Sequence, residues 1–239
     1  MPSATDVAEF YAAQNQLAGR AVRDLTQFWG TLDVERPKVA KRQLVEVVPA
    51  LTVAYGEASA VLAADWYDDM RATARVPGRF RAVMAAPFAV EYVRQRVDYG
   101  ARHLFTGAPG QTLEFLDGAV NRYVLQPGRE TIRESAVADP QAVGWKRETR
   151  PSKSFVSGCN FCNLLAGRGG VYKWDTAPFA SHDDCHCVAS PSWDQDAIEV
   201  PVDAYVASIQ NSQLSAEQRE ERSARARDWA RLQDAQRRN

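Results

Sequence analysis

All four cysteines of this 239-residue chain, and two of its three histidines, lie between residues 157 and 187. The cluster consists of Cys159, Cys162, His182, Cys185, His186 and Cys187. A Cys-x-x-Cys turn such as Cys159–Cys162 lets two thiolates face one ion, and it is the commonest half of a structural zinc site. The second half follows after nineteen intervening residues and offers histidine and cysteine within six positions. The spacing therefore predicts a structural metal site that joins two segments distant in the sequence.

The predicted ligands of one zinc ion are Cys159, Cys162, His182, Cys185 and Cys187. Zinc takes four of these, and the choice between Cys185 and Cys187 stays open. In an extended segment residues two apart share a face, so both could bind while His186 points away. Asp183 and Asp184 would add negative charge near the cation.

Other uses of the same residues compete with zinc. The cysteines could form two disulfides, or a Cys159–Cys162 disulfide beside free thiols, or they could stay buried and unligated beside a histidine. A redox Cys-x-x-Cys would need a βαβ pattern that is missing here. A zinc deaminase needs His-x-Glu and then Pro-Cys-x-x-Cys, but Gly158 precedes the pair and Leu104 and Phe105 follow His103. A Cys–His nucleophile and a phosphate loop at 164–172 are weaker alternatives, and the loop lacks the Walker ending.

The composition is that of an ordinary soluble chain, with 45% hydrophobic and 25% charged residues and a net charge of −1. This balance argues against bulk attraction to DNA or to an anionic membrane. No apolar run approaches the roughly 20 residues that span a bilayer, and the first residues lack a signal-peptide pattern. We therefore expect synthesis in a reducing cytoplasm, where clustered cysteines favour metal binding over disulfides.

Helical periodicity fills the first 140 residues. Ser3 or Thr5 is expected to cap a first helix that ends near Gly30. A second stripe follows Pro37 and continues to Trp66, with a kink or a break expected at the internal proline, residue 49. Further helices are predicted over 88–103, 112–125 and 129–138. Their apolar stripes are typical of core packing and show no cofactor motif.

The pattern changes near residue 140. Residues 145–150 alternate as an edge strand would, and the segment up to about 195 is too poor in aliphatic residues to fold by burial alone. A polar helix is predicted from Leu214, with a capping box at 215–218. The predicted fold class is α+β: a mainly helical domain over 1–140, a small zinc-stapled α+β module over 141–195, and a linker with a helical tail over 196–239.

Three segments resemble the C-terminal region of MuF-like minor capsid proteins, especially those of tailed phages and prophages of actinobacteria. They read GWKRET, CNFCNLLAGRGGVY and SHDDCHCVASPSW. The matching positions are Gly144, Trp145, Arg147, Cys159, Phe161, Cys162, Leu165, Ala166, Arg168, Gly169, Val171, Tyr172, His182, Asp183, Cys185, Cys187 and Pro191. The run departs from the family at Gly167, where a serine is common. The likeness covers about fifty residues, from roughly 143 to 193.

The resemblance implies a role in building the phage head. We expect a low-copy, non-enzymatic virion protein in the capsid interior, made in the host bacterial cytoplasm. Its implied partners are the portal and the capsid or scaffold proteins, with packaged DNA as a further contact and no membrane. Two alternatives stay open: a capsid maturation protease or other metal-dependent hydrolase, and a zinc-containing nucleic-acid-binding module. The spacing of residues argues for no Ser-His-Asp or Ser-Lys arrangement.

Overall fold

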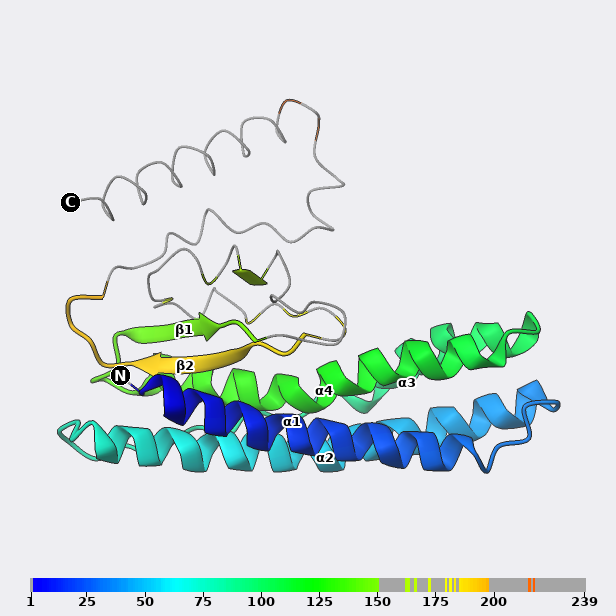
Figure 1. Cartoon of the computed structure of the whole chain (residues 1–239), viewed down its shortest axis with the longest axis horizontal. Coiled ribbons are helices and arrows are strands. Elements are labelled where there is room, and N and C mark those ends of the chain that lie inside the picture. Colours follow the sequence, from blue (N-terminus) through cyan, green and yellow to red (C-terminus); the bar gives the residue numbers. More distant parts are fainter. Residues whose placement is uncertain are drawn as a thin grey trace.

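The computed structural model describes residues 2–150 and 185–197, together with positions 162, 163, 166, 172, 179, 181, 183, 215 and 217. Its elements are α1 (Ala4–Trp29), α2 (Pro37–Thr73), α3 (Val90–Gly100), the 3₁₀ helix η1 (Ala101–Phe105), α4 (Pro109–Ala138), β1 (Gly144–Glu148) and β2 (Val188–Ser192). The helices run side by side, and the small sheet lies over one end of the bundle (Figure 1). A mainly helical chain with one small antiparallel sheet confirms the predicted α+β class.

The first helix begins and ends as the sequence predicts. Ser3 is the N-cap, since its hydroxyl accepts from the amide of Asp6 and its own amide donates to the Asp6 carboxylate, at 3.2 and 2.7 Å. Gly30 is the C-cap. Between them the buried positions recur at helical spacing, so α1 lays one apolar face on the bundle.

The second helix continues through Pro49, so a break there is wrong, and a kink, the other expected outcome, stays a prediction. A proline inside a helix removes one hydrogen bond and costs about 3 kcal/mol. Pro49 is buried, however, as are Leu44, Val48 and Thr52 of the same helix. Burial of this stretch of α2 therefore offsets the cost of the lost hydrogen bond. Of the described helices, α2 is the one long and apolar enough to cross a membrane by length and composition, a test that core helices also pass.

The fourth helix is also continuous, where the sequence predicted separate helices over 112–125 and 129–138. Its Pro127-Gly128 pair is a packing contact and not a helix end. A Cβ atom added to Gly56 of α2 would lie 3.2 Å from Pro127 Cγ, so the two helices approach closely here. The helix predicted over 88–103 is α3 followed by η1.

Two clusters of buried apolar side chains make up the core. One fills the middle of the bundle between all four α-helices. The other joins Val7, Tyr67 and Ile132 of the helices to Trp145 of the sheet and to three cysteines, Cys162, Cys185 and Cys187. Described residues on both sides of position 140 thus share one cluster. The division into the three predicted domains stays a prediction, and so does the C-terminal helix, of which only positions 215 and 217 are described.

Candidate metal centre

The two-stranded sheet positions one half of the cysteine cluster. β1 and β2 pair antiparallel, with Trp145 opposite Pro191 and Arg147 opposite Ala189. Trp145 also exchanges backbone hydrogen bonds with Tyr172, at 3.0 and 2.8 Å, so β1 is paired on both of its edges. Cys187 immediately precedes β2, and the register of the sheet therefore fixes where its side chain lies. The predicted alternation is confirmed over 145–148, since Trp145 and Arg147 are buried while the residues that follow them are partly exposed. It does not continue to 150, and the pairing of Trp145 on both sides means that β1 is not the predicted edge strand.

Three of the predicted ligands come together in the interior. The sulfur atoms of Cys162, Cys185 and Cys187 all lie within 4.8 Å of one another, and those of Cys162 and Cys185 are 3.7 Å apart. A tetrahedral zinc with bonds of about 2.3 Å has ligand sulfurs about 3.8 Å apart. The side chains are 1%, 1% and 2% exposed. The geometry of this trio, called the thiol cluster below, is that of a site that could hold a metal ion.

The pKa values of the three thiols are shifted in different directions. Hydrogen bonds from Cys162 and Cys187 lower the pKa of Cys185 well below its usual value, with a further contribution from Arg129. The pKa of Cys162 is raised by its hydrogen bonds with the other two thiols and by burial. For Cys187 the bond with Cys162 lowers the pKa, but the bond with Cys185 and burial outweigh it. Metal binding by these thiols would release their protons, because a metal ion binds the thiolate form.

Two buried arginines border the thiol cluster. Arg129 of α4 is 3% exposed and donates to the backbone carbonyls of Cys187, at 2.8 Å, and Cys185. Arg147 of β1 is 5% exposed, and its Nη1 lies 3.9 Å from the Cys162 sulfur. Both guanidinium groups lie over the ring of Phe179, with centroid distances of 5.2 and 3.8 Å. The cluster is thus surrounded by cations and aromatic carbon.

The residues between the cysteines have other partners. Asp183 pairs with Arg96 of α3 at 2.6 Å and with Arg122 of α4 at 3.3 Å, so two arginines balance its charge and tie the loop to the bundle. His186 lies with Nδ1 3.5 Å from the hydroxyl of Tyr11 on α1 and outside the thiol cluster. His186 therefore points away from the sulfurs, as expected if Cys185 and Cys187 both bind.

Cys159, His182 and Asp184 lie outside the described residues, so the fourth ligand stays a prediction. Cys185 and Cys187 form no disulfide within the part of the chain that the structure describes. Both disulfide alternatives involve Cys159, so they stay predictions. Sequence reasoning missed Arg129, because the predicted helix break at 126–128 hid the continuous helix that carries it into the core. Arg147 was found only as a motif position, and its burial on the alternating strand was the available signal.

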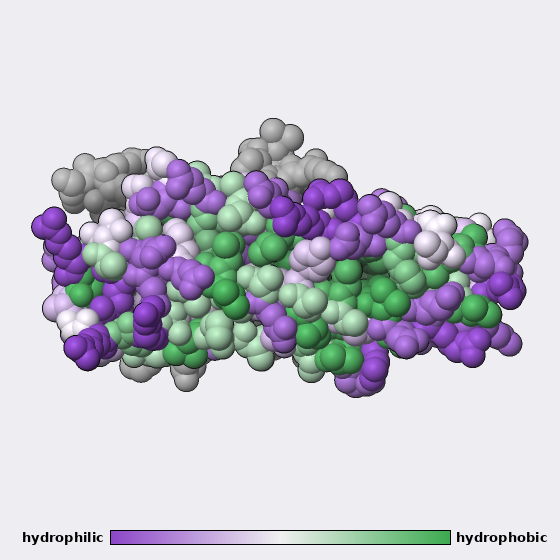
Figure 2. Space-filling view, turned by 90° about the horizontal axis from the view of Figure 1, so that it is seen from below, coloured by the Kyte–Doolittle hydropathy of each residue, from purple (hydrophilic) through white to green (hydrophobic). Residues whose placement is uncertain are grey.

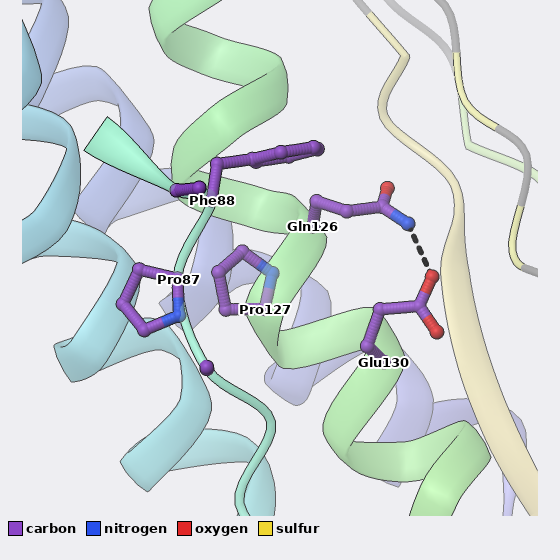
Figure 3. Close-up of a pocket in the computed structure, with 7 residues that line it drawn as sticks. Pro87, Phe88, Gln126, Pro127 and Glu130 are labelled. Atoms are coloured by element: carbon purple, nitrogen blue, oxygen red, sulfur yellow. Dashed lines mark hydrogen bonds between the residues drawn. The ribbon is translucent and has the colours of Figure 1, made fainter. Parts of the chain in front are cut away.

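A pocket of about 320 Å³ lies beside the module, between α4 and the segment before α3. Figure 3 shows Pro87, Phe88 and Pro127 around it, with Gln126 pointing toward Glu130. The Gln126 amide donates to Glu130 at 2.6 Å. This pocket is mostly apolar, and its polar side chains are paired with each other.

The same glutamine ties the bundle to the cysteine module. Gln126 Nε2 donates to the carbonyl of Phe179 at 2.9 Å, and its Oε1 accepts from the Ser181 hydroxyl at 2.7 Å. The polar groups of the pocket therefore hold Phe179, the ring that lies against the buried arginines, in place. These hydrogen bonds connect the helical bundle to the cysteine module.

A family model described as VG15 protein matches residues 1–212, which is most of the chain and includes the whole thiol cluster. The chain belongs to the VG15 protein family. This is a family of viral and phage proteins. No curated protein and no solved structure matches the chain. In this VG15 protein the matched region holds both the helical bundle and the cysteine module.

Proposed function

We propose that this VG15 protein is a minor capsid protein of a phage head, in which a zinc ion holds together the two segments of the cysteine module that carry its ligands. The observation that carries the proposal is the buried thiol cluster within a chain of a phage protein family, at the positions where the sequence resembles MuF-like proteins. Its localisation would be the interior of the virion. The protein would be made in the bacterial cytoplasm before assembly.

Zinc is the ion that the donors favour. Soft thiolates select zinc over magnesium or calcium, which take oxygen ligands. Three sulfurs within 4.8 Å of one another, one pair of them 3.7 Å apart, leave one position of a tetrahedral ion for Cys159 or His182. An ion there would tie the segment before β2 to the segment that carries Cys162. Structural zinc sites stabilise their modules in this way.

A structural role suits the burial of the cluster better than catalysis. Catalytic zinc keeps an open coordination position that a substrate or water can reach. The three cysteines are at most 2% exposed. The arginines that border them donate to backbone carbonyls or lie on the Phe179 ring. We therefore propose that the protein is not an enzyme.

The helical bundle offers the surface for assembly. An apolar groove of about 410 Å³ runs between α1 and α2, lined by Leu17, Val61 and Leu62 with Arg20 and Asp65 at its sides. Figure 2 shows hydrophobic residues gathered along the middle of one face of the molecule, with hydrophilic residues toward both ends. Apolar patches rimmed by polar residues are typical of protein interaction sites. We propose the portal as the first partner, followed by capsid or scaffold proteins.

The proposal is tested by co-expressing the chain with the portal and the major capsid protein of the same phage genome. We expect affinity-purified chain to bring down the portal. Val61, which is 47% exposed, gives a matched variant: Val61→Asp should weaken capture, while a substitution at the remote exposed Val137 should not. If the wild-type chain does not capture the portal but binds duplex DNA tightly at physiological salt, the nucleic-acid-binding alternative is favoured instead. Hydrolysis of the capsid protein would favour the protease.

A further inference from the structure

The guanidinium of Arg129 is buried next to the thiol cluster with no acidic partner among the described residues. Its side chain leaves α4 and ends between the bundle and the segment before β2, at 3% exposure. None of the ion pairs formed by the described residues includes it. Two of its nitrogens donate to the carbonyls of Cys185 and Cys187, and Nη1 has no hydrogen-bond partner in this part of the chain. Burying an unpaired charge is expensive, so a compensating anion is required nearby.

The thiol cluster supplies that anion when it holds a divalent ion. Three thiolates on a doubly positive ion leave one net negative charge. Two guanidinium groups, those of Arg129 and Arg147, border this charge, and Arg129 is the one that also binds the backbone of the cysteine segment. Arg129 donates to the backbone carbonyls of Cys185 and Cys187, the two residues on either side of His186. These hydrogen bonds fix the spacing of the two cysteines. The same side chain thus provides both the charge and the position that a three-thiolate centre needs.

We propose that Arg129 is a positioning residue of the metal centre, which sets the Cys185–Cys187 segment and makes the site specific for ions bound as an anionic thiolate complex. The inference rests on the zinc centre proposed above. It assigns α4 a part in metal binding that neither the motif nor the spacing of the cysteines contains. Outer-sphere partners of this kind change metal affinity by about 10- to 100-fold.

The test compares three substitutions in the full chain: Arg129→Met, Arg129→Gln and Arg129→Lys. Gln keeps a donor for a carbonyl without the charge, and Lys keeps the charge. We expect Arg129→Met and Arg129→Gln to weaken zinc binding about 10- to 100-fold, and Arg129→Lys to retain most of the affinity. Competition with a chromophoric chelator measures the zinc affinity. Arg133→Met is the matched control, since Arg133 lies one turn along α4 and pairs with Glu130 and Glu134 instead.

Cobalt substitution adds a readout that backbone support alone would not change. A cation beside the thiolates lowers the energy of their lone pairs, so its removal should shift the thiolate-to-cobalt charge-transfer bands to longer wavelength. We expect this shift in Arg129→Gln and its reversal in Arg129→Lys. If Arg129→Met does not fold, judged by its helical circular dichroism, the Gln and Lys pair decides the question.

The outcomes separate the two proposals. Wild-type chain that binds no zinc would overturn the metal centre itself. If the wild-type chain binds zinc and the Arg129→Met and Arg129→Gln variants bind it equally well, only the role of Arg129 is overturned. An Arg129→Lys variant that binds zinc as weakly as Arg129→Met would overturn the charge argument, because the retained cation would then have no effect.

Discussion

At the scale of single residues, Gly128 is the point where three helices meet. A Cβ atom there would lie 2.6 Å from Ser59 Oγ of α2 and 2.7 Å from Gln14 Nε2 of α1. These two side chains are buried and bonded to each other, at 2.6 Å between the hydroxyl and the amide oxygen. They cannot move apart without losing that bond, so only glycine fits.

We predict that Gly128→Ala destabilises the protein by about 1–3 kcal/mol, because it overpacks a rigid contact. Urea unfolding measures the change. Gly110→Ala on the same helix is the control, since nothing lies within 4 Å of its Cβ position, and it should leave stability unchanged or raise it. A Gly128→Ala variant as stable as the wild type would show that the helices can separate.

Asp139 is a buried carboxylate that directly follows the last residue of α4. Its side chain is fully buried and accepts from Arg71 Nε at 2.9 Å and from Trp193 Nε1 at 3.1 Å. Burial raises the pKa of Asp139, but the hydrogen bonds from Arg71, the Gln141 amide and Trp193 outweigh it and hold the pKa below its usual range. The ionised form therefore belongs to the folded state.

Because the folded pKa is depressed, the contribution of Asp139 is fully present above its unfolded value of about 3.9 and is lost as the pH falls through the folded pKa. We predict that Asp139→Asn costs about 3–5 kcal/mol at neutral pH, since it leaves the Arg71 charge buried and unpaired. It should also flatten the acid dependence of the melting temperature below pH of about 4. Asp33→Asn, which removes an exposed ion pair with Arg36, should change neither the stability at neutral pH nor the acid dependence of the melting temperature. A similar loss of stability in Asp33→Asn and Asp139→Asn would contradict the account.

At the scale of elements, the segment between α2 and α3 is held in place by the side chains of α4. The hydroxyl of Thr131 accepts from the amide of Ala85 at 3.0 Å, and that of Ser135 accepts from the amide of Val83 at 2.9 Å. Thr131 and Ala85 are buried. Polar side chains on the helix therefore take the place of a partner strand for this segment.

We predict that Thr131→Val destabilises the protein by about 1–3 kcal/mol, because the Ala85 amide would be left buried without an acceptor. Thr131→Ser keeps the hydroxyl and should retain most of the stability. Amide hydrogen exchange gives the local readout, with faster exchange at Ala85 in the valine variant only. Unchanged exchange there would mean that the hydrogen bond contributes nothing.

The sequence predicted the elements wherever local signals and packing agree. Ser3, Gly30 and the alternation around Trp145 are read correctly, since caps and strand periodicity are local. The breaks at Pro49 and Pro127 are wrong for one physical reason. Local propensity disfavours proline within a helix, but the facing helices bury both residues, and that packing is not visible in a single segment.

At the scale of the whole molecule, one cluster of buried side chains links the bundle to the cysteine module. Phe10 of α1 and Ile132 of α4 belong to the same cluster as Trp145 and the thiol cluster. The grouping of Cys162 with Cys185 and Cys187 was predicted from spacing, because soft ligands are rare and their types are informative. Their burial against α4 was not, since it depends on contacts between distant segments.

We predict that a fragment of residues 1–140 melts at a lower temperature than the full chain, because it exposes Val7, Phe10 and Ile132, which are at most 4% exposed in the whole protein. Circular dichroism and binding of a hydrophobic dye measure this. A fragment that melts at the same temperature and binds no dye would show that the helices form an independent domain.

Extended X-ray absorption at the zinc edge of the purified full chain tests the central claim most directly. The account predicts about one zinc per chain, with at least three sulfur neighbours at about 2.3 Å. Substitution of Cys162 or Cys187 by alanine should remove a sulfur from that shell or empty the site. A chain that carries no zinc, or zinc surrounded by oxygen and nitrogen alone, would contradict the account.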